Sequence, residues 1–132
     1  MRAEIERLFG GYRDAFDHGD AAAVARHVTA PAMLLGAETT LWATDADVSA
    51  AMERLVAFYR DSGFDSASFV LDRLLEQGGD HAIADVIWTI DRTQGRPPWR
   101  FRTGYNLRRR HGVWRIVVCT ACEEPAARLR AG

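Results

Sequence analysis

Tyrosine and tryptophan side chains are the residues of this chain best suited to bind a small molecule. Tyr12 falls on the apolar face of a predicted helix, and its hydroxyl could donate a hydrogen bond to a ligand oxygen or to a backbone carbonyl. Ligand pockets are mostly apolar with few polar groups, so some of the further aromatic residues could line a cavity instead of a plain core. The candidates for ligand contact are Tyr105, Trp42, Tyr59, Trp88 and Trp99.

The spacing of the cysteines and histidines favours no metal or redox chemistry. Cys119 and Cys122 spell C-x-x-C, which on a turn would be typical of a redox or metal site. Here the motif falls within a predicted strand, where the two side chains point to opposite faces. The histidines, at positions 18, 27, 81 and 111, share no spacing that builds a metal site. We therefore expect neither a metal nor a cofactor.

Asp85 interrupts a predicted strand that is otherwise apolar, where an unpaired carboxylate would be costly to bury. It could act as a general base, or it could form an ion pair with arginines of the neighbouring strand. Asp72 falls on the same face if the turn at Gly78-Gly79 contains two residues. A ladder of charges on an outer sheet face is the interpretation that the pattern favours.

Length and composition restrict the class of protein. A chain of 132 residues is predicted to form one domain over 1–132. The formal net charge of −1 provides no basic field for nucleic acid or an anionic membrane, and the run 108–110 of arginines lacks an aromatic platform. All 17 Lys+Arg residues are arginine, which excludes lysine Schiff-base chemistry. With no signal-like or membrane-spanning apolar stretch, we expect a cytoplasmic protein without membrane or nucleic-acid partners.

The elements that would position these residues follow from the apolar periodicity. A 3.6-residue period predicts a helix over 3–18, a short second helix that carries Val24 and Val28, and a third helix over 46–60. Short strands are predicted over 32–35 and 39–43, and long strands over 66–76, 81–91, 99–109 and 113–123. In the third strand of the chain, 66–76, alternation places Phe69, Leu71 and Leu75 on one face. The fold class is α+β, with helices covering one face of a long antiparallel sheet.

The register of the last hairpin can be predicted from a two-residue loop at His111-Gly112. Arg109 then faces Trp114, Leu107 faces Ile116, and Arg100 pairs with Glu123. The covered face carries Trp99, Phe101, Thr103, Tyr105, Leu107, Trp114, Ile116, Val118, Thr120 and Cys122. Arg108, Arg115 and Cys119 point to the opposite face.

The order helix, helix, hairpin, helix and four strands resembles the nuclear transport factor two-like superfamily, and within it the SnoaL-like domains. The resemblance covers about residues 3–124 and is carried by FGGYRDAFDHGDAAAVARHV at 9–28 and FRTGYNLRRRHGVWRIVV at 101–118. The Gly-x-Trp-Arg-Ile segment of the family is matched by Gly112 to Ile116. The resemblance implies a cone: a curved antiparallel sheet, an α+β barrel, wrapped by three helices around an apolar pocket. It also implies a homodimer through the outer sheet face.

The catalytic residues of the superfamily are matched only in part. The resemblance to ketosteroid isomerases places their helix-one tyrosine at Tyr12, which is therefore the candidate catalytic residue. The same alignment places their base at about Gly36 and their strand acid at Gly104 or Tyr105. Steroid isomerase chemistry is therefore not expected. No strand contains the Arg-x-Asp of the epoxide hydrolases of this fold, so their chemistry is not expected either.

Three hypotheses of function follow. The first is an isomerase, cyclase or dehydratase type of enzyme that acts on a small apolar, oxygen-bearing molecule by acid–base chemistry without metal. The second is a non-catalytic, ligand-binding or accessory homodimer. The third is a protein-interaction module whose cone is filled by its own side chains. An open cavity would argue against the third hypothesis, and a carboxylate or histidine inside it would favour the first over the second.

Overall fold

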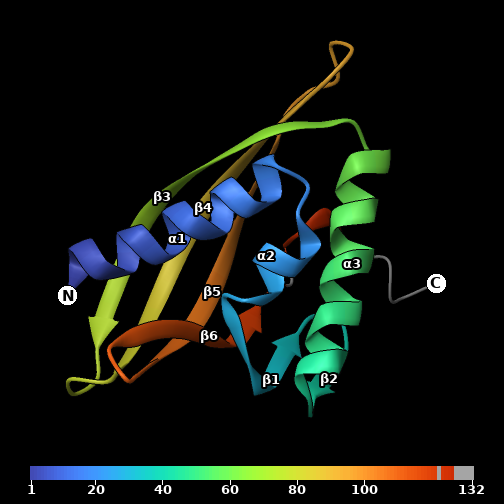
Figure 1. Cartoon of the computed structure of the whole chain (residues 1–132). Coiled ribbons are helices and arrows are strands. Elements are labelled where there is room, and N and C mark those ends of the chain that lie inside the picture. The colour runs from blue at the N-terminus through green and yellow to red at the C-terminus, as the bar shows by residue number, and fades with distance from the viewer. Residues whose placement is uncertain (122, 127–132) are drawn as a thin grey trace.

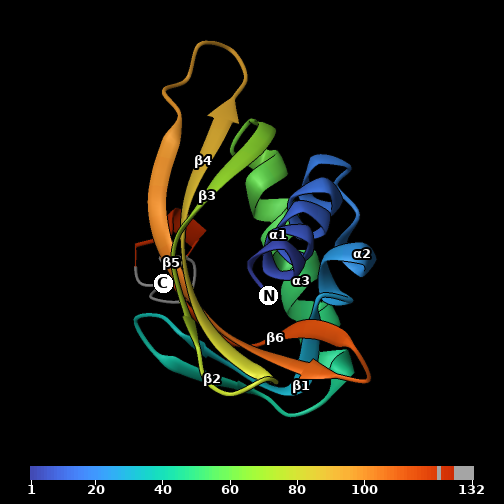
Figure 2. The same ribbon diagram turned by 90° about the vertical axis from the view of Figure 1, so that its left-hand side faces the viewer.

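The computed structural model describes residues 1–121 and 123–126. In this part of the chain a curved sheet carries three helices on its concave side (Figures 1 and 2). The elements are, in chain order, α1 (Arg2–Asp17), α2 (Ala21–Ala25), β1 (Val28–Leu35), β2 (Thr39–Trp42), α3 (Asp45–Asp61), β3 (Phe64–Glu76), β4 (His81–Arg92), β5 (Trp99–Arg110) and β6 (Val113–Thr120). None of these helices is long and apolar enough to cross a membrane.

The six strands form one open sheet in the order β2-β1-β6-β5-β4-β3. Neighbouring strands run antiparallel except β1 and β6, which are parallel. The predicted α+β cone is confirmed, with one parallel pair in place of a wholly antiparallel sheet. Because β2 and β3 remain as edges, the sheet curves around the helices without closing into a barrel.

Helices α2 and α3 begin where the sequence provides side-chain caps. The Asp20 side chain accepts a hydrogen bond of 3.0 Å from the Ala23 backbone N–H at the start of α2. Thr44 and Asp47 form a reciprocal capping box at the start of α3. Val28, which was predicted to lie in the second helix, instead begins β1 and pairs with Ile116 of β6. The second helix therefore ends at Ala25, earlier than the apolar spacing predicts, because Val28 already pairs with β6.

The last hairpin has the predicted register only as far as Leu107. Arg109 faces Trp114 and Leu107 faces Ile116, but Asn106 faces Val118, so Val117 is an extra residue in β6. Such a β-bulge reverses which side chains of the following residues point to the core.

Beyond this bulge the predicted faces are exchanged. Tyr105 faces Cys119 instead of Val118, Ala121 is buried, and Thr120 is exposed. The prediction that Val118 and Thr120 lie on the covered face, and Cys119 on the opposite one, is therefore wrong. Cys122 lies outside the described residues.

The strand predicted over 113–123 also ends early. β6 stops at Thr120, and Arg100 and Glu123 make no ion pair within the described residues. The predicted cross-strand pair between them is not formed, because the chain leaves the sheet before reaching it.

A second bulge lies in β3. Leu71 faces Val86 and Arg73 faces Asp85, so Asp72 is the extra residue. Leu74 consequently packs against the core, whereas Leu75, predicted on the same face as Phe69 and Leu71, is 58% exposed.

The carboxylates of Asp72 and Asp85 lie on the outer face of the sheet. The Arg102 guanidinium donates hydrogen bonds of 2.8 Å to Asp72 and 2.7 Å to Asp85. The hydrogen bond from Arg102 lowers the pKa of the Asp72 carboxyl. These contacts form the charge ladder that the sequence favours, and they show Asp85 as part of an ion pair.

Trp114 and Leu107 are buried and Arg108 is exposed, as predicted. The Trp114 indole N–H also donates a hydrogen bond of 2.8 Å to Glu4 of α1. We expect Trp114→Ala to lower the free energy of unfolding by about 3–5 kcal/mol, because it leaves a cavity in the core. Arg108→Ala should change it by less than about 0.5 kcal/mol. Urea unfolding measures both, and a larger loss for Arg108→Ala would contradict this packing.

Candidate functional site

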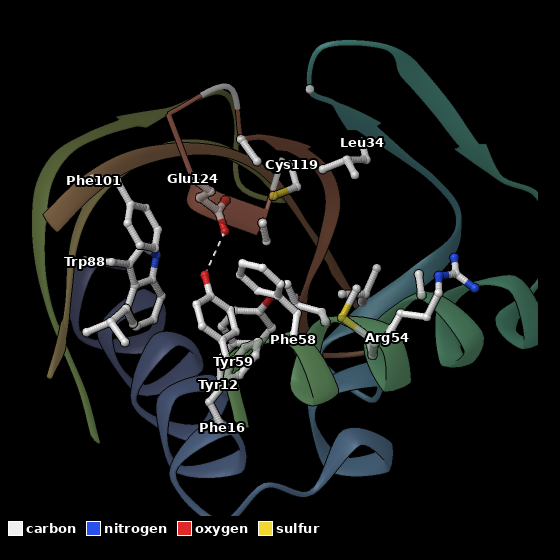
Figure 3. A pocket seen from close by; sticks show the side chains of 18 of the residues that line it. Tyr12, Phe16, Leu34, Arg54, Phe58, Tyr59, Trp88, Phe101, Cys119 and Glu124 are labelled. Carbon is white, nitrogen blue, oxygen red and sulfur yellow. Dashed lines mark hydrogen bonds between the residues drawn. The ribbon is translucent and has the colours of Figure 1, made fainter. Parts of the chain in front are cut away.

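A cavity of about 510 Å³ lies between the concave face of the sheet and the helices (Figure 3). Its wall is mainly apolar and aromatic. Helix α1 contributes Tyr12 and Phe16, α3 contributes Phe58 and Tyr59, and the strands contribute, among others, Trp42, Trp88, Phe101 and Tyr105. Cys119 also lines it, because the bulge in β6 turns this side chain inward.

The structure brings five of the six residues predicted from the sequence to this cavity. The five are Tyr12, Trp42, Tyr59, Trp88 and Tyr105. Trp99 is not among the lining residues. It stacks on Phe58, with ring centroids 5.9 Å apart and planes at 14°, while the Arg92 guanidinium lies 4.1 Å from its ring centroid. Trp99 thus supports a cavity wall from behind, and ligand contact by the other five stays a prediction.

The group in the cavity best suited to acid–base chemistry is the Glu124 carboxyl, which was not among the residues predicted from the sequence. Glu124 follows β6 and lines the cavity beside Tyr59 (Figure 3). Its Oε2 accepts a hydrogen bond of 2.9 Å from the Thr103 hydroxyl, and its Oε1 accepts a longer one of 3.5 Å from the Tyr59 hydroxyl. Thr103 is fully buried, at 0% exposure, so its hydroxyl is a fixed donor from β5.

Burial in this apolar wall raises the pKa of the Glu124 carboxyl from 4.5 to about 7. The hydrogen bonds from Thr103 and Tyr59 act in the opposite direction but do not cancel the effect. A carboxyl with such a pKa can both take up and release a proton near neutral pH. It therefore has the property that acid–base catalysis requires.

Two tyrosine hydroxyls face the same cavity as hydrogen-bond donors. The Trp88 indole N–H donates a bond of 3.0 Å to the Tyr105 oxygen, which leaves the Tyr105 proton available for another acceptor. No group in the described part of the chain accepts a hydrogen bond from Tyr12. In the same part of the chain, every side-chain oxygen or nitrogen that is inaccessible to solvent has a hydrogen-bond partner. The unbonded Tyr12 hydroxyl is therefore accessible, and because Tyr12 lines the cavity, we infer that the hydroxyl faces the cavity.

Burial raises the pKa of Tyr12, Tyr59 and Tyr105 well above the usual value of tyrosine, and the charge of Glu124 adds to the effect. These hydroxyls stay protonated at neutral pH and serve as donors, not bases. The cavity therefore combines one acid–base group with neutral donors for a ligand oxygen.

The position at which the resemblance places the isomerase base is occupied by Gly36, which lines the cavity without a functional group. Of the two positions at which the resemblance places the strand acid, Gly104 and Tyr105, only Tyr105 is among the described lining residues. The carboxylate of this cavity comes instead from the segment after the last strand. Among residues 1–121 and 123–126 no three His, Cys, Asp or Glu side chains gather in a way that could hold a metal ion.

The sequence contains an acidic pair at the end of the last strand, but strand alternation alone does not show that one of its members faces the cavity. Glu123 and Glu124 follow an apolar strand directly and precede Pro125. Strand parity predicts the wrong inward residues because of the bulge at Val117. It places Glu123 at the end of the strand, opposite Arg100, and assigns no role to Glu124.

A curved, open sheet wrapped by three helices around a deep cavity defines the nuclear transport factor two-like (NTF2-like) class of proteins. The family described as NTF2-like protein (DUF6841) matches residues 3–124, and the chain belongs to it. No curated protein matches the sequence.

Solved structures share the fold at low sequence identity. An NTF2-like protein of unknown function from Shewanella oneidensis is 15% identical with a TM-score of 0.75, covering 90% of this chain and 96% of that one. A ketosteroid isomerase-like protein from Erwinia carotovora is 19% identical with a TM-score of 0.68, covering 89% and 92%. A Novosphingobium aromaticivorans protein assigned as a scytalone dehydratase is 14% identical with a TM-score of 0.65, covering 90% and 80%. The fold is thus shared with proteins named for isomerase and dehydratase activities.

The raised pKa of Glu124 makes a prediction for stability. The folded protein keeps this proton to higher pH than the unfolded chain, so the free energy of unfolding loses a contribution as pH rises from 4.5 to about 7. Glu124→Gln removes this loss and retains an acceptor for Thr103. We expect it to stabilise the protein at pH 8 by about 1–3 kcal/mol, and by much less at pH 4.

Urea unfolding at both pH values measures the effect. Glu123→Gln is the matched control, because Glu123 is exposed and lies one residue away. A Glu124→Gln variant that is equally stable relative to the wild type at pH 4 and pH 8 would show that the carboxyl is not held in an apolar environment.

Proposed function

We propose that the protein is an acid–base enzyme that moves a proton on a small apolar molecule with a carbonyl oxygen, as isomerases, cyclases and dehydratases do. The observation that carries the proposal is the Glu124 carboxyl, which lines an apolar cavity that also contains the open Tyr12 hydroxyl. The names of the isomerase-like and dehydratase-assigned structures support this class, although their identity to the chain shows the fold alone.

In the proposed reaction Glu124 removes a proton from a carbon next to the carbonyl group. The electron pair of the C–H bond forms a C=C bond, and the electrons of the C=O bond move onto oxygen. Hydrogen bonds from Tyr12 and Tyr105 stabilise the negative charge on that oxygen. The electron pair on oxygen then re-forms the C=O bond. In an isomerisation, a neighbouring β,γ C=C bond shifts into conjugation with the carbonyl group and Glu124 returns the proton to the γ carbon. In a dehydration, the C–O bond of a β-hydroxyl breaks as a C=C bond forms between the α and β carbons, and Glu124 gives its proton to the hydroxyl, which leaves as water.

The protonation state of Glu124 suits this role. A general base is most effective when its pKa lies near the working pH, and burial brings Glu124 to about 7. Thr103 holds Oε2 by the shorter hydrogen bond, which leaves the more weakly bonded Oε1 for the proton transfer.

The alternative function is a binding protein that uses the same cavity without catalysis. A pocket that only binds an apolar ligand would gain nothing from an acid that is costly to bury. Glu124 is therefore the observation that favours the enzyme over the binding protein.

Exchange of α-protons tests the proposal without knowledge of the natural substrate. We expect the protein to accelerate hydrogen–deuterium exchange of the bicyclic ketone 2-tetralone, measured by proton NMR. The rate should rise with pH through about 7, because only deprotonated Glu124 is a base. Glu124→Gln should lower it by about 100-fold or more, and Tyr12→Phe by about 100-fold.

The Glu123→Gln variant should exchange the ketone like the wild type, since this side chain is exposed. Binding of 2-tetralone with no acceleration of exchange would overturn the enzyme and support the binding protein. Equal exchange rates for the wild type and Glu124→Gln would show that another group is the base.

We also propose that two copies associate through the outer face of the sheet. This face carries the half-buried Ile83, Ile87 and Val117, and Val70, which is 58% exposed, beside the charges around Arg102. A monomer would expose these apolar groups to water. Light scattering at micromolar concentration should give twice the chain mass, and Ile87→Glu should give a monomer. A wild-type species of 14.7 kDa would refute the dimer.

A further inference from the structure

The cavity has a cation at its edge that the proposed proton transfer does not use. Arg54 of α3 is the one positively charged side chain among the described lining residues. Its guanidinium has no carboxylate within ion-pair distance and no hydrogen-bond acceptor in the described part of the chain. In Figure 3 it extends from α3 on the side of Leu34, whereas Glu124 lies nearer to Trp88 and Phe101.

The other two acids of the described lining besides Glu124, Asp61 and Glu38, form no ion pair with Arg54. Asp61 lies at an N–O distance of 3.5 Å from Arg60 of the same helix, so its charge is already compensated. Glu38, in the loop between β1 and β2, lines the cavity and is exposed, and it forms no ion pair within the described residues. Because Glu38 subtracts from the charge of Arg54, the described lining offers a bound anion one positive charge at most.

From this arrangement we propose that the substrate carries a carboxylate, which Arg54 binds at the cavity edge while the ketone lies between Glu124 and the tyrosines. This inference rests on the proposed function and names the class of its substrate: an apolar oxo acid. A guanidinium presents paired N–H donors that fit the two oxygens of a carboxylate. A dianion such as a phosphate monoester is disfavoured, because the single charge of Arg54 would not balance it and Glu38 of the same lining would repel it.

The separation of the two ends of the cavity makes this binding compatible with catalysis. A carboxylate near Glu124 would oppose the deprotonation of the base, since like charges raise the pKa of an acid. At the Arg54 end the carboxylate remains partly hydrated and meets the opposite charge, so it avoids most of the desolvation cost of a buried ion.

A matched pair of probes tests the proposal: 4-(2-naphthyl)-4-oxobutanoic acid and its methyl ester. Both carry the same ring and ketone, and only the acid is charged. At pH 6, where Glu124 is mostly protonated, we expect the wild type to bind the acid about fivefold to tenfold more tightly than the ester in calorimetric titrations at low salt. The preference should decrease in 0.5 M salt, because an exposed ion pair is screened.

Variants locate the effect. Arg54→Met should abolish the preference for the acid and leave the affinity for the ester unchanged, which also shows that the variant is folded. Glu38→Gln should strengthen binding of the acid, because it removes a competing negative charge. Arg110→Met is the control: it removes the same charge from an exposed position at the β5–β6 turn and should keep the preference.

The outcomes separate this inference from the proposed function. Equal binding of acid and ester by the wild type, or a preference that survives in Arg54→Met, overturns the carboxylate site and leaves the enzyme standing. Binding of the ester without α-proton exchange overturns the enzyme, while a preference that depends on Arg54 still supports the carboxylate site. Binding of neither probe counts against both.

Discussion

The cavity chemistry depends on one extra residue in β6. Without the bulge at Val117, Cys119 would point outward and the strand would continue in register along β5. With it, the alternation is reversed, Ala121 is buried, and the chain leaves the sheet after Thr120, so that Glu124 reaches the cavity. A β-bulge bends its strand and increases the local twist, and it is a common device for aiming a side chain at a functional site. Here the device places the only carboxyl that both lines the apolar wall and is hydrogen-bonded within it, among the described residues.

The Glu124 carboxylate is energetically costly to bury in the cavity wall, and its side-chain hydrogen bonds come from Thr103 and Tyr59. Thr103 is the single buried polar side chain of the described core, and its hydroxyl makes the shorter of the two hydrogen bonds to Glu124. No arginine compensates the charge, since the cation of the cavity, Arg54, lies on another side of it (Figure 3). Desolvation makes the ionised form of Glu124 unfavourable here, and proteins concentrate such locally unfavourable choices at functional sites. This is the physical reason for proposing a functional role for Glu124 instead of a structural one.

The sequence predicted what regular periodicity encodes. The apolar face of α1 placed Tyr12 toward the sheet, and the turn at His111-Gly112 aligned Leu107 with Ile116. Strand alternation, however, carries information only until a residue is inserted, and neither bulge has a sequence mark such as glycine or proline. Leu75 and Cys119 were therefore assigned to the wrong faces. Glu124 was missed for the related reason that a charged residue after a strand looks solvated unless the path of the chain is known.

The two faces of the sheet show why one carboxyl is available for proton transfer and others are not. On the outer face, the Arg102 hydrogen bond lowers the pKa of Asp72, so this acid stays ionised at neutral pH and is a poor proton carrier. On the inner face, Glu124 receives hydrogen bonds only from neutral hydroxyls, and desolvation brings its pKa to about 7. The two carboxyls therefore differ in protonation because they lie on different faces of the sheet. An arginine on the outer face keeps Asp72 ionised, whereas the apolar wall allows Glu124 to be either protonated or ionised near neutral pH. The position of the proposed acid–base group is consequently set by strand geometry, and α1 and β5 place the tyrosine hydroxyls around the same cavity.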